Sequence, residues 1–185
     1  MQTQILLIAP ADAEAAPFAA QLEAVLAERD ISALLLPRGT RAENAYKDFA
    51  RRIVPIAQAA GCAVLLEGAP GLVKMLGADG LHVAGADVEA TREAVEALRP
   101  GMIVGVGDVT SRDDAMTLGE LGVDYVLFGP LSGAINPATR EMARWWAETM
   151  EIPSVLSDPD ASFDVFDAEG CEFIGLAMPA REAAI

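Results

Sequence analysis

The chain has 185 residues, 52% of them hydrophobic, and its 13 basic and 28 acidic side chains give a formal net charge of −15. A surface this acidic repels nucleic acid and anionic lipid, so we expect neither as a partner. No apolar run approaches the roughly 20 residues of a membrane span, and residues 1–10 lack the basic region of a signal peptide. We therefore expect a cytoplasmic protein with one domain over residues 1–185.

Eight short apolar runs predict strands that are buried on both faces, as in a parallel sheet. They cover residues 4–10, 32–37, 62–66, 80–83, 102–106, 125–128, 154–156 and 173–178. Helical patterns follow these runs at residues 17–28, 42–60, 70–76, 88–98, 111–121 and 137–150, with a short helix expected at 163–168. The segment REAAI leaves room for no more than a stub of a last helix.

A recurring helix-to-strand transition supports this alternation. GADGLHV, GVDYVLFGP and, more weakly, GCEFIGL each place a glycine that can close a helix just before a strand. Strands alternating with helices in this way predict a short (β/α)8 TIM barrel with a vestigial last helix. A doubly wound open sheet is the alternative, and the count of eight strands favours the barrel.

The two cysteines begin the third and the eighth predicted strands. Cys62 and Cys171 each follow a glycine in apolar surroundings. These strands are not neighbours in an eight-stranded ring, so the two Cα atoms should lie beyond the roughly 7 Å that a disulfide tolerates. We expect two buried free thiols.

In such a barrel the functional site is built by the loops after the strands. Glu67 and Asp87 follow adjacent strands, and their carboxylates suit a hard divalent ion such as Mg²⁺. Arg38 and Arg41 form a cationic pair on the same rim, which suits a phosphate or a carboxylate. The alternative is that these are ordinary polar loop residues.

Three aromatic or titratable residues leave two interpretations open. His82 is the single histidine and is either a packed structural residue or a functional group. Trp145 and Trp146 are consecutive on a helix and cannot both face the barrel. The outer one marks either a contact in a homo-oligomer or a plain surface tryptophan.

Two blocks carry a resemblance to a known family. LGADGLHVAGAD at 76–87 resembles the pattern L-G-A-D-G-[VI]-H-[LV]-G-Q-x-D, and LGVDYVLFGP at 121–130 resembles G-A-D-Y-[VI]-x-[FV]-G-P. IVGVG at 103–107 resembles the family's G-V-S after the fifth strand. The chain thus resembles the thiamine phosphate synthase and thiazole tautomerase family of (β/α)8 barrels.

The resemblance implies a reaction and a site in thiamine biosynthesis. The implied transferase moves a pyrimidine-methyl group from its pyrophosphate to a thiazole phosphate, with Mg²⁺ as cofactor and phosphorylated heterocycles as substrates. Asp87 and Glu67 would hold the metal, and Arg38 and Asp87 would act in catalysis. The substrate-binding residues that the resemblance implies are Arg38, Arg41, Gly107, Gly129 and Arg140.

The departures from the family pattern fall on functional positions. Leu36 and Thr40 replace a glutamine and a lysine around Arg38, and Gly107 replaces a serine. Glu67, Gly68 and Ala69 stand where the family has Asn-Asp-Arg, and Gly85 stands where it has a glutamine. Asp158 and Pro159 replace a Gly-Gly turn. The lysine of the family's Thr-x-Thr-Lys segment has only a displaced substitute, Arg140.

These departures predict weak or lost synthase activity. One alternative is a non-catalytic or repurposed member, a pseudoenzyme that binds another small ligand or a protein partner. The other is a thiazole tautomerase-like isomerase, for which His82 is the one candidate base.

Overall fold

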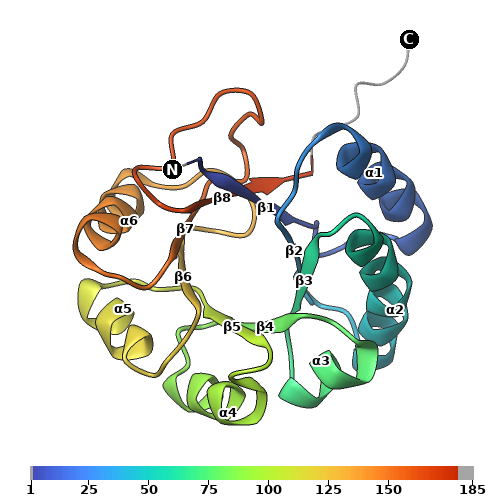
Figure 1. The fold of residues 1–185 in the computed structure, drawn as a ribbon, viewed down its shortest axis with the longest axis horizontal. Coiled ribbons are helices and arrows are strands. Elements are labelled where there is room, and N and C mark those ends of the chain that lie inside the picture. The colour runs from blue at the N-terminus through green and yellow to red at the C-terminus, as the bar shows by residue number, and fades with distance from the viewer. Residues whose placement is uncertain (1, 179–185) are drawn as a thin grey trace.

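Eight parallel strands close into a barrel in the order β1-β2-β3-β4-β5-β6-β7-β8 in a computed structural model that describes residues 2–178 (Figure 1). The strands are β1 (Gln4–Ile8), β2 (Ala33–Leu36), β3 (Ala63–Leu66), β4 (Gly80–Val83), β5 (Ile103–Val106), β6 (Tyr125–Phe128), β7 (Ser154–Ser157) and β8 (Phe173–Ala177). The pairing of β1 with β8 closes the ring, so the barrel predicted from the sequence is confirmed.

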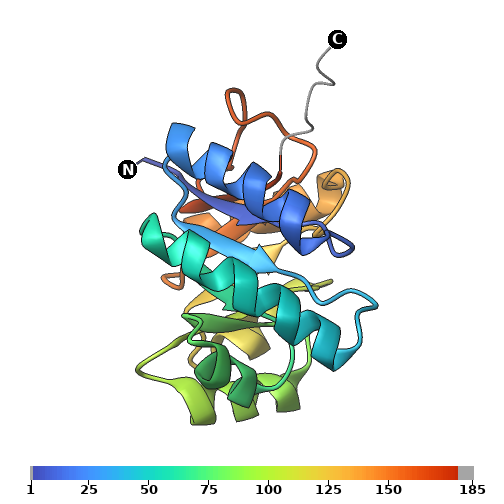
Figure 2. The same ribbon diagram turned by 90° about the vertical axis from the view of Figure 1, so that its right-hand side faces the viewer.

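Six helices of the described chain lie outside the strands. They are α1 (Ala15–Glu28), α2 (Glu43–Ala59), α3 (Pro70–Leu76), α4 (Val88–Leu98), α5 (Arg112–Gly119) and α6 (Pro137–Thr149). Figure 2 shows α1 and α2 lying side by side against the barrel wall. Pro55 lies inside α2, which continues to Ala59.

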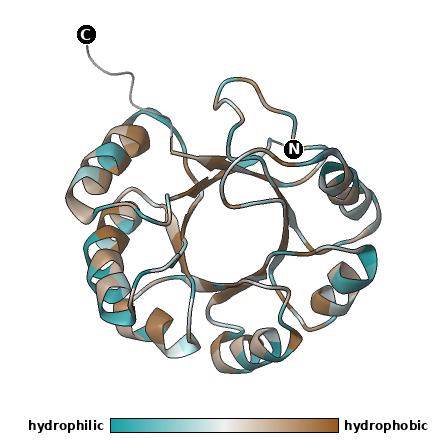
Figure 3. Cartoon of the chain, turned by 180° about the vertical axis from the view of Figure 1, so that it is seen from behind, coloured by the Kyte–Doolittle hydropathy of each residue, from teal (hydrophilic) through white to brown (hydrophobic). Residues whose placement is uncertain are grey.

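Alternate residues of each strand face the barrel interior or the helices, as the pleat of a strand requires. The strands form an apolar ring in Figure 3. The interior cluster consists of Leu6, Ile8, Ala33, Leu35, Leu65, Tyr125, Leu127 and Val155. A larger cluster fills the space between strands and helices, and Leu66 and Leu81 belong to it.

Because all eight strands run in the same direction, the loops after them gather at one end of the barrel. We call this end the rim. It carries Arg38, Glu67, Asp87, Asp108 and Asp158, which come directly after five different strands or open the next helix. The candidate site residues named from the sequence are therefore at one end of the molecule.

The short helix expected at 163–168 is absent, and this prediction is wrong. Residues 158–172 form an irregular loop instead. Side chains bind the backbone within this loop, because Ser162 accepts from the Asp164 N–H and Asp167 accepts from the Glu169 N–H. Such short-range bonds compete with the helical ladder.

Both cysteines are free and buried within the described chain, as predicted. No helix among residues 2–178 is long and apolar enough to cross a membrane. The vestigial last helix expected in REAAI lies outside the described residues.

Candidate functional site

A row of four inward positions crosses the barrel wall from β3 to β6. The pairing of Leu66 with Leu81 carries the next residues, Glu67 and His82, to neighbouring positions. His82 pairs with Gly105, and Gly105 pairs with Tyr125. Because Leu66 and Leu81 face the helices, the residues after them face the interior. We call Glu67, His82, Gly105 and Tyr125 the polar row.

Within this row the Tyr125 hydroxyl reaches across Gly105 to His82. The phenol oxygen lies 2.7 Å from His82 Nδ1, and the two rings are stacked with their planes 13° apart. A Cβ on Gly105 would lie 1.9 Å from Cζ of Tyr125. Glycine at this position is therefore what allows the tyrosine ring to lie over β5.

His82 is almost fully enclosed, with 2% of its surface exposed. Burial lowers the pKa of His82 to about 4, and the Asp108 carboxylate opposes this shift. A Cβ on Gly107 would lie 2.7 Å from His82 Nε2, so the second ring nitrogen is directed past Gly107 toward the rim. His82 is consequently a neutral imidazole beneath the mouth of the barrel.

Glu67 is held in place by a tyrosine that sequence reasoning missed. Tyr46 of α2 donates from its hydroxyl to the Leu36 carbonyl at 2.5 Å and accepts from the Glu67 N–H at 2.9 Å. Burial raises the pKa of the Glu67 carboxyl, the Arg38 backbone lowers it and the Asp108 charge raises it. The sequence gives one signal for this role: Tyr46 lies on an otherwise apolar helix face, where its buried hydroxyl needs a hydrogen-bond partner.

The two arginines after β2 differ in how many contacts their guanidinium groups make within the protein. Arg41 donates to the carbonyls of Ala13 and Pro37, and its guanidinium lies 4.1 Å from the centroid of the Phe49 ring. Arg38 donates from Nε to the Arg41 carbonyl at 3.1 Å. Among the described residues the terminal nitrogens of Arg38 have no hydrogen-bond partner, which leaves them for an anion at the rim.

Asp87 and Asp108 both bind backbone near the end of β4. Asp87 is the N-cap of α4 and accepts from the Ala90 N–H at 3.0 Å, and Asp108 accepts from the Gly85 N–H at 2.6 Å. Within residues 2–178 no three His, Cys, Asp or Glu side chains form a metal cage. Magnesium is commonly held by one or two carboxylates together with substrate phosphates, so Glu67 and Asp87 have suitable donor chemistry.

Arg140 and Asp158 neutralise one another. Arg140 lies 2.7 Å from the Asp158 carboxylate and 3.6 Å from that of Glu169, and it also donates to the Asp167 carbonyl. Asp158 further accepts from the Ile135 N–H. The arginine that the resemblance offers for substrate is therefore engaged in holding the loop after β7.

Gly129 has a structural role at the end of β6. Its φ of +115° and a hypothetical Cβ 2.2 Å from the Ser157 carbonyl oxygen both require glycine. The Ser157 hydroxyl donates to the Pro130 carbonyl at 2.5 Å, which ties the loops after β6 and β7 together. The backbone N–H of Gly129 remains in the set proposed for substrate binding.

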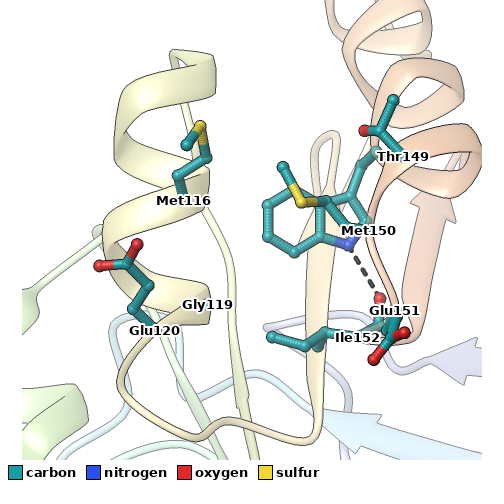
Figure 4. Close-up of a pocket in the computed structure, with 8 residues that line it drawn as sticks. Met116, Gly119, Glu120, Thr149, Met150, Glu151 and Ile152 are labelled. Carbon is teal, nitrogen blue, oxygen red and sulfur yellow. Dashed lines mark hydrogen bonds between the residues drawn. The ribbon is translucent and has the colours of Figure 1, made fainter.

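A hollow of about 480 Å³ lies away from the rim, between the ends of α5 and α6 (Figure 4). Met116 of α5 lies on one side of it, and Met150 and Ile152 lie on the other side in the figure. Trp146 forms its floor, is 1% exposed and donates to the Ile152 carbonyl. Trp145 is half-buried, with the Arg112 guanidinium 4.6 Å from the centroid of its ring. Trp146 is thus buried and Trp145 is only half-buried, as expected for two consecutive residues on a helix.

Comparison with known proteins identifies the family. A sequence profile described as "Thiamine monophosphate synthase" matches residues 5–157. The chain belongs to the thiamine monophosphate synthase family. It is 34% identical over 157 residues to the thiamine-phosphate synthase of Rhodospirillum centenum, a match that covers 82% of this chain and 75% of the relative. With the same enzyme of Erythrobacter litoralis it shares 32% identity over 188 residues, 95% of this chain and 86% of the other.

Solved structures agree on the fold of this family member. The thiamine phosphate pyrophosphorylase from Pyrococcus furiosus superposes with a TM-score of 0.78 at 17% identity, covering 97% of this chain and 89% of that one. The YdjI aldolase from Escherichia coli superposes with a TM-score of 0.67 at 18% identity, covering 94% and 75%. Both likenesses concern the barrel alone.

Proposed function

We propose that this family member catalyses the thiamine phosphate synthase reaction at a low rate. It would join a pyrimidine-methyl group to a thiazole phosphate and release pyrophosphate. The observation that carries this proposal is the match to curated thiamine-phosphate synthases at 32–34% identity over most of the chain. The cytoplasmic location and a homo-oligomeric state stay predictions.

Arg38 would hold the departing pyrophosphate. Its terminal guanidinium nitrogens are without a partner in the described chain, and a guanidinium suits phosphate oxygens. Glu67 and Asp87 would hold Mg²⁺ together with that pyrophosphate, and the ion would stabilise the negative charge of the leaving group. The N–H group of Gly129 is a further proposed donor, since it stands at the rim. The N–H group of Gly107 donates to the Val83 carbonyl, so the role proposed for Gly107 is to leave room for the substrate and not to bind its pyrophosphate.

We expect a low rate because the other two arginines considered for the site already form hydrogen bonds or ion pairs within the protein. Arg41 is bound to two carbonyls, and Arg140 is bound to Asp158 and Glu169. Each preorganised donor lost from a transition state typically costs about a hundredfold or more in rate. Among residues 2–178, Arg38 is the one arginine considered for this site whose terminal nitrogens have no partner, so the site offers fewer donors than the family pattern.

Two other functions remain open as alternatives. The engaged arginines favour a repurposed member that binds a different small ligand or a protein partner. A thiazole tautomerase-like isomerase would need His82 as general base. The low pKa of His82, about 4, makes it a weak base, so we place this function last.

Product formation tests the proposal. The purified protein is incubated with the pyrimidine pyrophosphate, the thiazole phosphate and Mg²⁺, and thiamine phosphate is measured over time. We expect turnover far below the enzyme median of about 10 per second. Arg38→Gln should lower it further, whereas Arg51→Gln, on the exposed face of α2, should leave it unchanged. The absence of product would favour the repurposed member.

A further inference from the structure

His82 is buried and has one ring nitrogen without a partner. Nδ1 meets the Tyr125 hydroxyl, and no described residue hydrogen-bonds Nε2. No fully enclosed side-chain nitrogen or oxygen among residues 2–178 lacks a partner. Nε2 must therefore reach solvent, and it does so beside Gly107, at the rim end of β5. This nitrogen is available to a ligand that enters the barrel mouth.

The bond to Tyr125 decides which nitrogen of His82 carries the proton. A phenol has one proton to donate, and the only partner of the Tyr125 hydroxyl in the described chain is Nδ1. If Nδ1 were the donor, the phenol proton would be left without an acceptor inside the barrel, which is unfavourable. Tyr125 therefore donates, Nδ1 accepts, and the neutral ring carries its proton on Nε2.

The charges around the ring restrict what this N–H can bind. Asp108, which follows β5, raises the pKa of His82 by its charge, and Glu67, which follows β3, raises the pKa of Tyr125 in the same way. Two carboxylates beside the mouth oppose the approach of a phosphate oxygen to Nε2. An uncharged acceptor, such as a ring nitrogen of an aromatic heterocycle, meets no such opposition.

We propose that Tyr125 is a positioning residue that holds His82 as a neutral Nε2–H donor, and that this donor binds an uncharged ring nitrogen of the pyrimidine substrate. The identity of the ligand rests on the proposed function, whereas the tautomer rests on the geometry alone. Gly105 and Gly107 are part of the same arrangement, because the first gives space to the tyrosine ring and the second leaves Nε2 open.

Nitrogen NMR tests the tautomer. The chain has one histidine, so protein labelled with ¹⁵N-histidine gives a single set of ring signals. At pH 7 we expect a protonated, pyrrole-type Nε2 and an unprotonated, pyridine-type Nδ1. Tyr125→Phe should abolish this preference and give a mixture of tautomers. A proton on Nδ1, or an imidazolium at pH 7, would overturn the proposal.

Binding of two separate probes tests the ligand. The unphosphorylated hydroxymethylpyrimidine should shift the Nε2 signal, whereas inorganic pyrophosphate should not. Gly107→Ala places a methyl group on Nε2, and it should weaken pyrimidine binding about tenfold in calorimetry without changing pyrophosphate binding. Gly101→Ala is the matched control, because a Cβ there has no neighbour within 4 Å. Tyr125→Phe should weaken pyrimidine binding as well and serves if Gly107→Ala does not fold.

The outcomes separate this inference from the proposed function. Pyrimidine binding that leaves the His82 signals unchanged, unmeasurable pyrimidine binding, or unaltered pyrimidine affinity in both variants contradicts the inference even if thiamine phosphate forms. A shifted Nε2 signal without product formation supports the inference and contradicts the synthase.

Discussion

Arg140 of α6 and Asp158 after β7 form an ion pair of 2.7 Å at the rim, with 27% and 15% of their side chains exposed. The resemblance places Arg140 on the substrate, whereas in the structure its charge is balanced by Asp158 and Glu169. Arg38, on the far side of the rim, keeps its terminal nitrogens free of partners among the described residues.

This difference predicts which arginine binds pyrophosphate. Arg38→Gln should weaken pyrophosphate binding about tenfold, because it removes a charged hydrogen bond. Arg140→Gln should leave the affinity nearly unchanged but lower the free energy of unfolding by about 1–3 kcal/mol, since Asp158 loses its positively charged partner and keeps only the Ile135 N–H. Calorimetry and urea unfolding measure the two quantities. Equal losses of pyrophosphate affinity in both variants would show that Arg140 also binds the substrate.

The buried His82 predicts a pH dependence of stability. Its folded pKa of about 4 lies below the value of 6.5 for an exposed histidine, so the unfolded chain binds the proton more tightly. The contribution of His82 is complete above pH 6.5 and is lost as the pH falls toward 4, by about 3 kcal/mol in total. Urea unfolding between pH 7 and 4.5 should show this loss in the wild type and not in His82→Gln. If the free energy of unfolding falls by the same amount in the wild type and in His82→Gln, the prediction is wrong.

Gly105 should tolerate no side chain. Gly105→Ala would place Cβ 1.9 Å from the Tyr125 ring, and displacing that ring also breaks its bond to His82. We expect a loss of about 3 kcal/mol or more in the free energy of unfolding. Gly101→Ala, which meets nothing within 4 Å, should lie within about 0.5 kcal/mol of the wild type. Thermal unfolding of the two variants makes the comparison.

Tyr46 should matter through its hydroxyl. Tyr46→Phe removes the bonds to the Leu36 carbonyl and the Glu67 N–H, and we expect a loss of about 1–3 kcal/mol. Because Glu67 is a proposed metal ligand, the variant should also need more Mg²⁺ for half-maximal activity. Tyr46→Phe with unchanged stability would show that water replaces the hydroxyl at no cost.

The thiols should be unreactive in the folded protein. Burial raises the pKa of Cys62 to about 12 and that of Cys171 to about 11, so almost no thiolate is present at pH 8. A thiol reagent such as Ellman's should therefore react slowly with the native chain and rapidly with two thiols in 6 M guanidinium. A fast native reaction at either cysteine would mean that the wall around it opens.

The sequence by itself determined the barrel and the family, because both can be recognised from patterns of neighbouring residues. Buried strands of four or five residues, each preceded by a helix that a glycine such as Gly77 or Gly122 can end, can be recognised without knowing what packs on them. The segment 163–168 shows the limit of this approach, since its turn-forming side chains outweighed a weak helical pattern.

The tertiary structure alone decided which rim residues are free. Arg140 and Asp158 are 18 residues apart, Tyr46 and Glu67 are 21 apart, and His82 and Tyr125 are 43 apart. Each contact depends on the register between strands and on how a helix packs on the wall. A sequence pattern identifies a charged or polar side chain, but only closure of the barrel determines which partner that side chain meets.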